Sequence, residues 1–337
     1  MSEDCQARIP VSVIVGMRNS ATTIISCLDG LVSQYYPITE IIVIDNVSTD
    51  NSAALVAGYL PSRPVPLRLV RQTTDGGLTT SYNTGAEMAL APLLVFVHSD
   101  SMLPTPHELG RLVAPLLADS SVVAAYSNLL MPAEVWSRFP YWQKYLFARM
   151  ALLERPCMCG KFDCGRKETY WKVGGHNVVR FTATCGYGGE DSDLNRRLMM
   201  AGRVTGSSAR VIHLHDLSAG YGLRALFRTR KMLARTYGKI IVFQGLAPTR
   251  GKLPFFAKPA LTLVPFVPHL FWVGLGVLLA FSAVYSRRMY TSRCTLLNWR
   301  IALVPLVDMA LLYHESFWFV EGLLAPPADA PGRARSR

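Results

Sequence analysis

The sequence predicts an α/β domain with a mainly parallel sheet, followed by an apolar helical segment that associates with a membrane. Within the first hundred residues, short β-branched runs alternate with stretches of helical spacing, which is typical of parallel α/β sheets. Residues 259–286 contain no Asp, Glu, Lys or Arg, and about 20 apolar residues are enough to cross a bilayer. Half of the 337 residues are hydrophobic and the mean hydropathy is +0.22, which also favours membrane contact.

The order of apolar residues predicts where the strands and helices of the α/β domain lie. Continuous apolar runs predict strands that are covered on both faces; they are residues 11–16, 40–45, 67–70 and 93–97. Helical spacing after Ser, Asn or Asp predicts the intervening helices; they lie within residues 19–34, 46–60 and 81–91. Residues 122–211 are less regular. There, a glycine-rich turn predicts a helix that begins near Asp191 and ends before Gly202.

Polar groups follow three of the predicted strands, at Gly16 to Asn19, at Asp45-Asn46 and at His98-Ser99-Asp100. Ligands of parallel sheets bind beyond the carboxyl ends of the strands. Asp and Asn are also common in ordinary turns, but three polar strand ends on one edge favour a nucleotide or phosphate site. Neither G-x-G-x-x-G after the first strand nor G-x-x-x-x-G-K-[ST] is present, which argues against a dinucleotide fingerprint and a P-loop.

Charge and cysteine content narrow the class of protein further. The formal net charge is +12, and a basic stretch from Arg224 to Lys258 leads into the apolar segment. This order favours lipid headgroups or a lipid phosphate over nucleic acid as the anionic partner. The seven cysteines show no paired C-x-x-C spacing, so we expect neither a zinc site nor a disulfide framework but reduced cysteines in the cytoplasm. The polar first ten residues predict no secretory signal.

The C-terminal third is expected to form a membrane-associated helical region over residues 251–325, after a first domain of residues 1–250. Residues 259–286 are long enough to span a bilayer, but Pro265, Pro268 and the arginines after residue 286 leave a re-entrant or in-plane hairpin as the alternative. Residues 301–324 carry acidic groups and are expected to be interfacial and amphipathic. Residues 326–337 are expected to be a disordered tail.

Four sequence blocks, taken in order, resemble family 2 glycosyltransferases with the GT-A fold, a Rossmann-like nucleotide-diphospho-sugar transferase domain. The blocks are VSVIVGMRNS, EIIVIDNVSTDNS, YNTGAEMALAPLLVFVHSDSMLP and GGEDSDLNRRLMMAG. The similarity runs from about residue 10 to residue 216. It implies inverting transfer of a sugar from a nucleotide diphosphate, with Mg²⁺ or Mn²⁺ as the cofactor.

Carried over position by position, the resemblance implies a donor site at the three polar strand ends. The residues it would place there are Gly16, Arg18, Asp45, Asn46, Asn83, His98 and Ser99. Asn46 replaces the family's usual second carboxylate, which leaves the identity of the base open. The stretch His98-Ser99-Asp100 stands at the family's Asp-x-Asp, so Asp100 would bind the metal beside the diphosphate.

The block around Asp191 would supply the acid–base chemistry. Inversion needs one general base for the acceptor hydroxyl; Asp191 matches the family's base, and Glu190 beside it would orient it or contact the acceptor. Carboxylates at a helix start also complement the helix dipole, which is the structural alternative. His215 is expected to be a further metal ligand, with His213 as the other candidate.

The expected function is that of a hexosyltransferase-like enzyme of cell-envelope glycan synthesis, bound to the membrane with its catalytic domain in the cytoplasm. Its partners would be a nucleotide-diphosphate sugar, membrane lipid, and an acceptor that is a glycan hydroxyl or a polyprenyl-linked molecule, with no nucleic acid. The replacement of two carboxylates by His98 and Asn46 motivates an alternative, a non-catalytic, membrane-anchored nucleotide-sugar-binding protein. A nucleotidyltransferase on a similar sheet is a third hypothesis, which the GEDSDLNRRL block opposes.

Overall fold

The computed structural model describes residues 9–59, 64–156, 158–181, 188–214, 220–243 and 253–325. The chain divides into two compact units. The first, here called the sheet unit, consists of residues 1–131, 153–185 and 190–218; the second, the helical unit, consists of residues 132–152, 186–189 and 219–337. The helical unit therefore includes segments that the sequence analysis placed in the first domain. The tail expected to be disordered lies outside the described residues.

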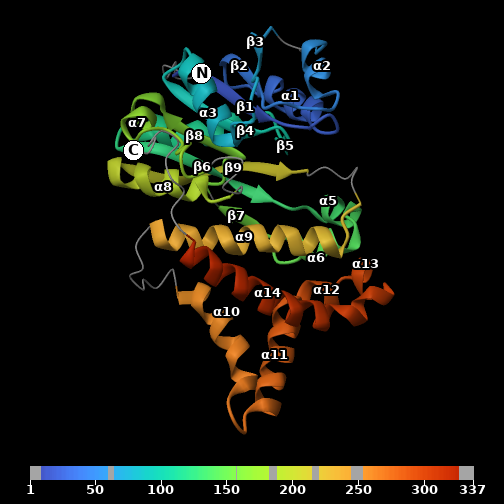
Figure 1. Ribbon diagram of the computed structural model, residues 1–337. Helices are drawn as coiled ribbons and strands as arrows, with labels where there is room; N and C mark the ends of the chain where they lie inside the picture. Colours follow the sequence, from blue (N-terminus) through green and yellow to red (C-terminus); the bar gives the residue numbers. More distant parts are fainter. Residues whose placement is uncertain are drawn as a thin grey trace. The chain divides into compact units, whose positions relative to one another are not determined.

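A nine-stranded sheet forms the centre of the sheet unit, with the strand order β3-β2-β1-β4-β8-β6-β9-β5 and with β7 paired to β6 (Figure 1). The strands are β1 (Val11–Met17), β2 (Ile38–Asp45), β3 (Leu67–Arg71), β4 (Leu93–His98), β5 (Ser101–Met102), β6 (Val122–Leu130), β7 (Glu154–Pro156), β8 (Phe162–Arg166) and β9 (Arg203–His213). The first four are parallel to one another. β8 runs antiparallel to both β4 and β6, and β6 and β9 are parallel. The predicted α/β sheet is confirmed.

Apolar residues explain the burial of the strands in the parallel half. All seven residues of β1 are buried, as are five of the six in β4, because helices cover both faces of such a sheet. The helices of this unit are α1 (Ile24–Val32), α2 (Ser52–Ala57), α3 (Gly77–Met88), α4 (Glu108–Ala118), α7 (Lys167–Lys172) and α8 (Glu190–Ala201). α3 begins at Gly77, four residues before the predicted start at Ser81.

The close approach of α3 to β1 depends on Gly85, which gives the first testable prediction. A Cβ atom at Gly85 would lie 2.3 Å from Cγ2 of the buried Ile14. We expect Gly85→Ala to lower the free energy of unfolding by about 1–3 kcal/mol, because overpacking outweighs the gain in helix propensity. Urea unfolding measures this. Gly58→Ala, at the end of α2 with its nearest neighbour at 3.5 Å, is the matched control; equal stability of the two variants would contradict the packing argument.

The helical unit contains the C-terminal apolar segments, together with α5 (Ala133–Arg138), α6 (Tyr141–Phe147) and α9 (Leu223–Phe243). Its remaining helices are α10 (Leu253–Leu263), η1 (Val264–Phe266), α11 (Phe271–Tyr285), α12 (Arg287–Thr291), α13 (Arg293–Leu296), η2 (Trp299–Leu303) and α14 (Val304–Leu324). α14 packs along α9, and α10, η1 and α11 form a helical hairpin (Figure 1).

Of the two alternatives that the sequence leaves open for residues 259–286, one spanning helix or a hairpin, the structure has a helical hairpin. Pro265 and Pro268 interrupt the segment, and His269 at φ +65° reverses the chain, so α10 and α11 are two shorter helices. The helix that is long and apolar enough to span a bilayer is instead Trp299–Leu324, the one such helix within the described ranges. It was expected to be interfacial. A helix in the core of a helical domain has a similar length and composition. In Trp299–Leu324, 44% of the apolar 18-residue stretch is buried.

The acidic groups of α14 have partners within the helical unit, which explains how an apolar helix carries them. Asp308 accepts hydrogen bonds from the hydroxyls of Ser282 and Ser286. Glu321 forms a two-fold ion pair with Arg235, at 2.6 and 2.8 Å. Buried carboxylates are tolerated where such partners satisfy them, so α14 is a central element of this unit.

Candidate active site at the carboxyl edge of the sheet

The strand register brings the three polar strand ends together. In the parallel pairings, Gly16 of β1 lies opposite His98 of β4, and Met17 lies opposite Asp45 of β2. The Asp45 carboxylate is buried, accepts a hydrogen bond from the Ser48 amide at 3.0 Å and faces the Arg71 guanidinium at 3.4 Å. The predicted clustering of these residues at one edge of the sheet is therefore present in the structure.

A residue that the sequence analysis missed, Asp75, connects two of the predicted donor-site residues. Its carboxylate pairs with the guanidinium of Arg18 and accepts a hydrogen bond from the Asn46 side-chain amide at 2.8 Å. Burial raises the pKa of Asp75, but the bonds from Asn46 and Arg18 outweigh this and hold the pKa below its usual value. Asp75 follows β3 in the stretch TTDGG, so the rule that found the other strand ends points to it as well.

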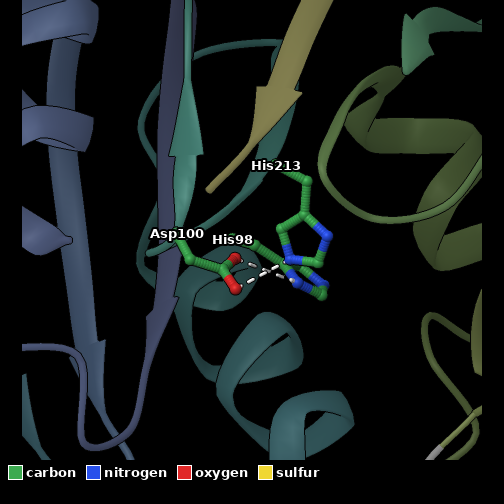
Figure 2. A group of neighbouring side chains, drawn as sticks. All are labelled: His98, Asp100 and His213. Atoms are coloured by element: carbon green, nitrogen blue, oxygen red, sulfur yellow. Dashed lines mark hydrogen bonds and ion pairs between the residues drawn. The ribbon is translucent and has the colours of Figure 1, made fainter. Parts of the chain in front are cut away.

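The three side chains drawn in Figure 2, His98, Asp100 and His213, form a group whose ligand atoms all lie within 4.8 Å of one another. Asp100 Oδ2 is 2.7 Å from Nε2 of His213, and Asp100 Oδ1 is 3.8 Å from Nδ1 of His98. The pairing of β5 with β9 sets Ser101 opposite His213 and so fixes this contact. His215, the predicted metal ligand, lies outside the described residues.

This group has the chemistry of a divalent-cation site. Burial lowers the pKa of His98 to about 3 and lowers that of His213, although Asp100 opposes the shift at His213. Neutral imidazole is the form that binds a metal. Within the described part of the chain, the buried Nε2 of His98 makes no hydrogen bond. One carboxylate and two neutral imidazoles are ligands that a divalent cation can take in a protein.

Asp191 stands in the first turn of α8, directly after Gly188 and Gly189, whose φ angles of +121° and +94° favour glycine. Its carboxylate accepts a hydrogen bond from the Ser192 amide at 2.7 Å. Burial raises the pKa of Asp191, and the positive charge of Lys161 partly opposes the shift. Glu190 is the first residue of the helix.

Two further residues of this site, Lys161 and Asp163, were missed by the sequence analysis. Lys161 follows Gly160, where an added Cβ atom would lie 3.3 Å from Nε2 of His98, and its positive charge lowers the pKa of His98, of His213 and of Asp191. Asp163 on β8 is buried and accepts amide hydrogen bonds from Cys159 and Gly160 at 2.9 and 2.6 Å. Burial raises its pKa well above the usual value, and Cys159 and Asp191 add to the increase.

Other predicted residues have structural partners. The Asn83 side chain donates to the His176 carbonyl at 2.9 Å and accepts from the His176 amide at 2.9 Å. The Ser99 hydroxyl lies 2.7 Å from that of Ser20. Arg197 on α8 pairs with Asp193 at 2.8 Å and donates a hydrogen bond to the Val173 carbonyl. The donor-site roles of Asn83 and Ser99 stay predictions.

Comparison with known proteins decides the family. Residues 12–174 match the family described as Glycosyl transferase family 2. This part of the chain is a family 2 glycosyl transferase domain. The resemblance seen in the sequence is thereby confirmed over residues 12–174, and the roles given to His98 and Asp100 stay predictions. The sequence block that contains Asp191 lies after residue 174 and is therefore outside this match.

Individual relatives agree with this family 2 assignment. The chain is 32% identical over 99 residues to the uncharacterized glycosyltransferase YibD of Escherichia coli K12, covering 29% of this chain and 28% of the relative. It is 25% identical over 120 residues to a PGL/p-HBAD biosynthesis glycosyltransferase of Mycobacterium tuberculosis H37Ra, covering 36% of this chain and 46% of the relative. The chain thus spans less than half of the length of these curated relatives.

A solved structure extends the similarity in fold beyond the family 2 domain. The mannosyltransferase PcManGT from Pyrobaculum calidifontis, solved with GDP-Man and Mn²⁺, superposes with a TM-score of 0.59. The alignment covers 95% of this chain and 89% of that protein at 19% identity. At this identity the likeness concerns the fold, and it confirms the GT-A architecture predicted from the sequence.

Proposed function

We propose that this protein is an inverting glycosyltransferase that moves a sugar from a nucleotide-diphosphate sugar to an acceptor hydroxyl and requires a divalent cation. The observation that carries the proposal is the His98–Asp100–His213 group at the carboxyl edge of the sheet, whose ligand atoms all lie within 4.8 Å of one another. A metal-binding group and a candidate base at one edge of the sheet are the two elements that this reaction needs.

Each side chain then has a specific task. Asp100, His98 and His213 would hold the cation, whose chemistry is to neutralise charge on the leaving diphosphate. Lys161 adds a second positive charge for the phosphates. Arg18 and Asn46, fixed by Asp75, contact the nucleoside. Asp191 accepts the proton of the attacking hydroxyl, and Glu190 orients the acceptor.

Two comparisons support the cofactor and the biological setting. PcManGT was solved with GDP-Man and Mn²⁺, which supports a divalent cation as the cofactor of the proposed reaction. The mycobacterial relatives are named for PGL/p-HBAD biosynthesis, which suits an envelope glycan as product. We infer that the helical unit attaches the protein to the cytoplasmic side of the membrane and that the acceptor is a lipid-linked glycan or a polyprenyl phosphate.

A donor panel tests the proposal. The full chain in detergent is incubated with Mn²⁺ or Mg²⁺ and a set of nucleotide sugars, with and without a lipid extract, and released nucleoside diphosphate is measured. We expect metal-dependent release from one donor, stimulated by lipid. Saturable donor binding without release from any donor would instead favour the non-catalytic sugar-nucleotide-binding protein.

The pH dependence of the rate gives a further prediction. Asp191 acts as a base only when deprotonated, and burial raises its pKa, so the rate falls as the pH drops through this raised pKa. Lys161→Met removes the charge that lowers the pKa of Asp191, and its acid limb moves to higher pH. The rate of transfer, measured as a function of pH at saturating donor and Mn²⁺, gives the position of this acid limb. Lys161→Arg keeps the charge and serves as the control; an unmoved limb in Lys161→Met would contradict the assignment.

A further inference from the structure

A cavity lies within the helical unit. It has a volume of about 330 Å³ and is lined by residues of α9, α10, α11 and α14, together with Arg149 after α6. Its size is at the lower end of the range of small-molecule sites, about 300–1,000 Å³. None of the residues proposed above for sugar transfer contributes to it.

The cavity carries an excess of positive charge. Its ionisable lining consists of the cations Arg149, Arg230 and Lys258 and the single carboxylate of Glu315, three charges against one, apart from two tyrosines. Glu315 pairs with Arg230 at 3.5 Å and with Lys258. Arg149 is exposed, whereas the side chains of Arg230 and Lys258 are 14% and 30% exposed and share the one carboxylate of Glu315. A bound anion would place further negative charge beside these two cations.

The three cationic groups surround the ring of Tyr285. The ring of Tyr285 faces Arg149, Lys258 and Arg230, with the cationic groups 4.8, 5.1 and 5.8 Å from the ring centroid. The Arg230 side chain is 14% exposed, and its buried Nε makes no hydrogen bond within the described ranges. A donor of this kind, held in a concave basic site, suits the oxygen atoms of a phosphate group.

The remaining wall of the cavity is apolar, formed by Leu233, Pro259 and Phe319 among others. A site for a free anion does not need such a wall, but a ligand with a hydrocarbon chain does. The combination of a basic centre and an apolar wall therefore favours an amphiphile.

The position of the cavity along the helical hairpin agrees with a membrane lipid. Tyr285 ends α11, and the opposite end of the hairpin exposes large apolar side chains, including Phe266 (74% exposed) and Trp272 (77% exposed). At 1.5 Å per residue, α11 is about 20 Å long. The hydrocarbon of one leaflet is about 15 Å deep, with headgroups beyond it. A hairpin inserted tip first to the middle of the bilayer brings Tyr285 to the headgroup level.

We propose that this cavity of the helical unit binds the phosphomonoester headgroup of a membrane lipid, with Arg149, Arg230 and Lys258 around the phosphate. A phosphomonoester carries a charge of about −1.5 to −2 at neutral pH, which suits a lining of three cations and one carboxylate. The hydrocarbon chain of the lipid lies along the apolar wall of the cavity. The site is independent of the metal group, and lipid-linked acceptors of the proposed reaction share this headgroup.

Vesicle flotation of the full chain tests the proposal without any sugar donor, so its outcome does not depend on sugar transfer. The vesicles are phosphatidylcholine with phosphatidic acid, whose headgroup is a bare phosphate, or with phosphatidylserine at matched surface charge. We expect tighter binding to phosphatidic acid. Arg230→Gln and Lys258→Gln should each remove this preference and weaken binding about tenfold, since a hydrogen bond to a charged group contributes about 1.5–3 kcal/mol.

Arg228→Gln is the matched control, because Arg228 is exposed on the same helix and does not line the cavity. An equal loss in this variant would show general surface electrostatics and overturn the proposal. Saturable binding of inorganic phosphate without a preference between the vesicles would assign the site to a soluble phosphate and overturn the lipid assignment. Binding to RNA without binding to vesicles would overturn it too.

A second measurement uses the unmodified protein and does not depend on the folding of a variant. Lys258 is labelled with an amine-reactive reagent, and its modification is followed by mass spectrometry. We expect phosphatidic acid vesicles to protect Lys258 several-fold more than phosphatidylserine vesicles, while Lys144 on α6 outside the cavity is labelled equally in both. Equal labelling of Lys258 with both lipids would overturn the proposal.

Discussion

Asp100→Ala is expected to lower the rate of metal-dependent sugar transfer by about a thousandfold, because metal stabilisation of a leaving group is worth several kcal/mol. Asp100 is the single carboxylate of the metal group, and both histidines contact it at 2.7 and 3.8 Å. Without its charge, two neutral imidazoles hold a divalent cation weakly. Calorimetric titration with Mn²⁺ and the rate of nucleoside diphosphate release measure the two effects together.

The matched control for this variant is Asp119→Ala, which removes an exposed carboxylate paired with Arg203 at 3.0 Å. Surface pairs of this kind contribute about 0–1 kcal/mol, so we expect unchanged Mn²⁺ affinity and rate. His213→Ala should weaken Mn²⁺ binding while leaving part of the activity. If Asp100→Ala bound Mn²⁺ as the unmodified protein does, the metal would have to be held elsewhere, and the assignment of this group would fail.

The parts of the site that the sequence reveals are those set by local patterns. β1, β2 and β4 are mainly apolar, and parallel strands place their carboxyl ends on one edge of the sheet. The amino-acid pattern alone is therefore enough to group Gly16, Asp45 and His98, and the strand register agrees. Asp75 obeys the same rule, but the strand that precedes it is short and only partly buried.

Lys161 and Asp163 depend instead on long-range pairing. β8 is inserted antiparallel between β4 and β6, with Asp163 opposite Phe96 and Tyr126. The local sequence of this stretch, CGKFDCG, draws attention to its cysteines and gives no sign of a strand that borders the site. The two-residue strand β5, which sets His213 beside Asp100, is likewise too short for any periodicity to predict.

The C-terminal segments show the limit of composition as a guide. A run without charges satisfies the length criterion for a span, yet Pro265 and Pro268 divide it into the two helices of a hairpin. The charges of residues 301–324 suggested an interfacial helix, but Arg235 and Lys258 pair with Glu321 and Glu315 inside the unit. A hydropathy scale counts charged residues without regard to their partners. It therefore predicts too long a helix for residues 259–286 and too exposed a position for the acidic groups of residues 301–324.

Asp191→Asn is the second change with a large expected effect, because it removes the base and keeps the size of the side chain. General-base catalysis contributes about 10²–10⁴-fold, so we expect the rate of transfer to fall by that factor while donor and Mn²⁺ affinities stay within about twofold. The acid limb of the rate profile should also disappear, since it reports the titration of Asp191. Steady-state kinetics with the donor identified by the panel, together with donor titration, measure these effects.

Asp193→Asn separates catalysis from the structural role of an acidic helix start. Asp193 lies in the same turn of α8 and pairs with Arg197 at 2.8 Å, so its loss should lower the melting temperature and leave the acid limb in place. If Asp191 acted only on the helix dipole, the effect of Asp191→Asn would be about 0.3–1 kcal/mol on stability, with the rate nearly unchanged. A rate loss confined to Asp191→Asn, with normal donor binding, is the result that assigns the base. Loss of stability without loss of rate would leave the helix-dipole role as the explanation and remove Asp191 from the mechanism.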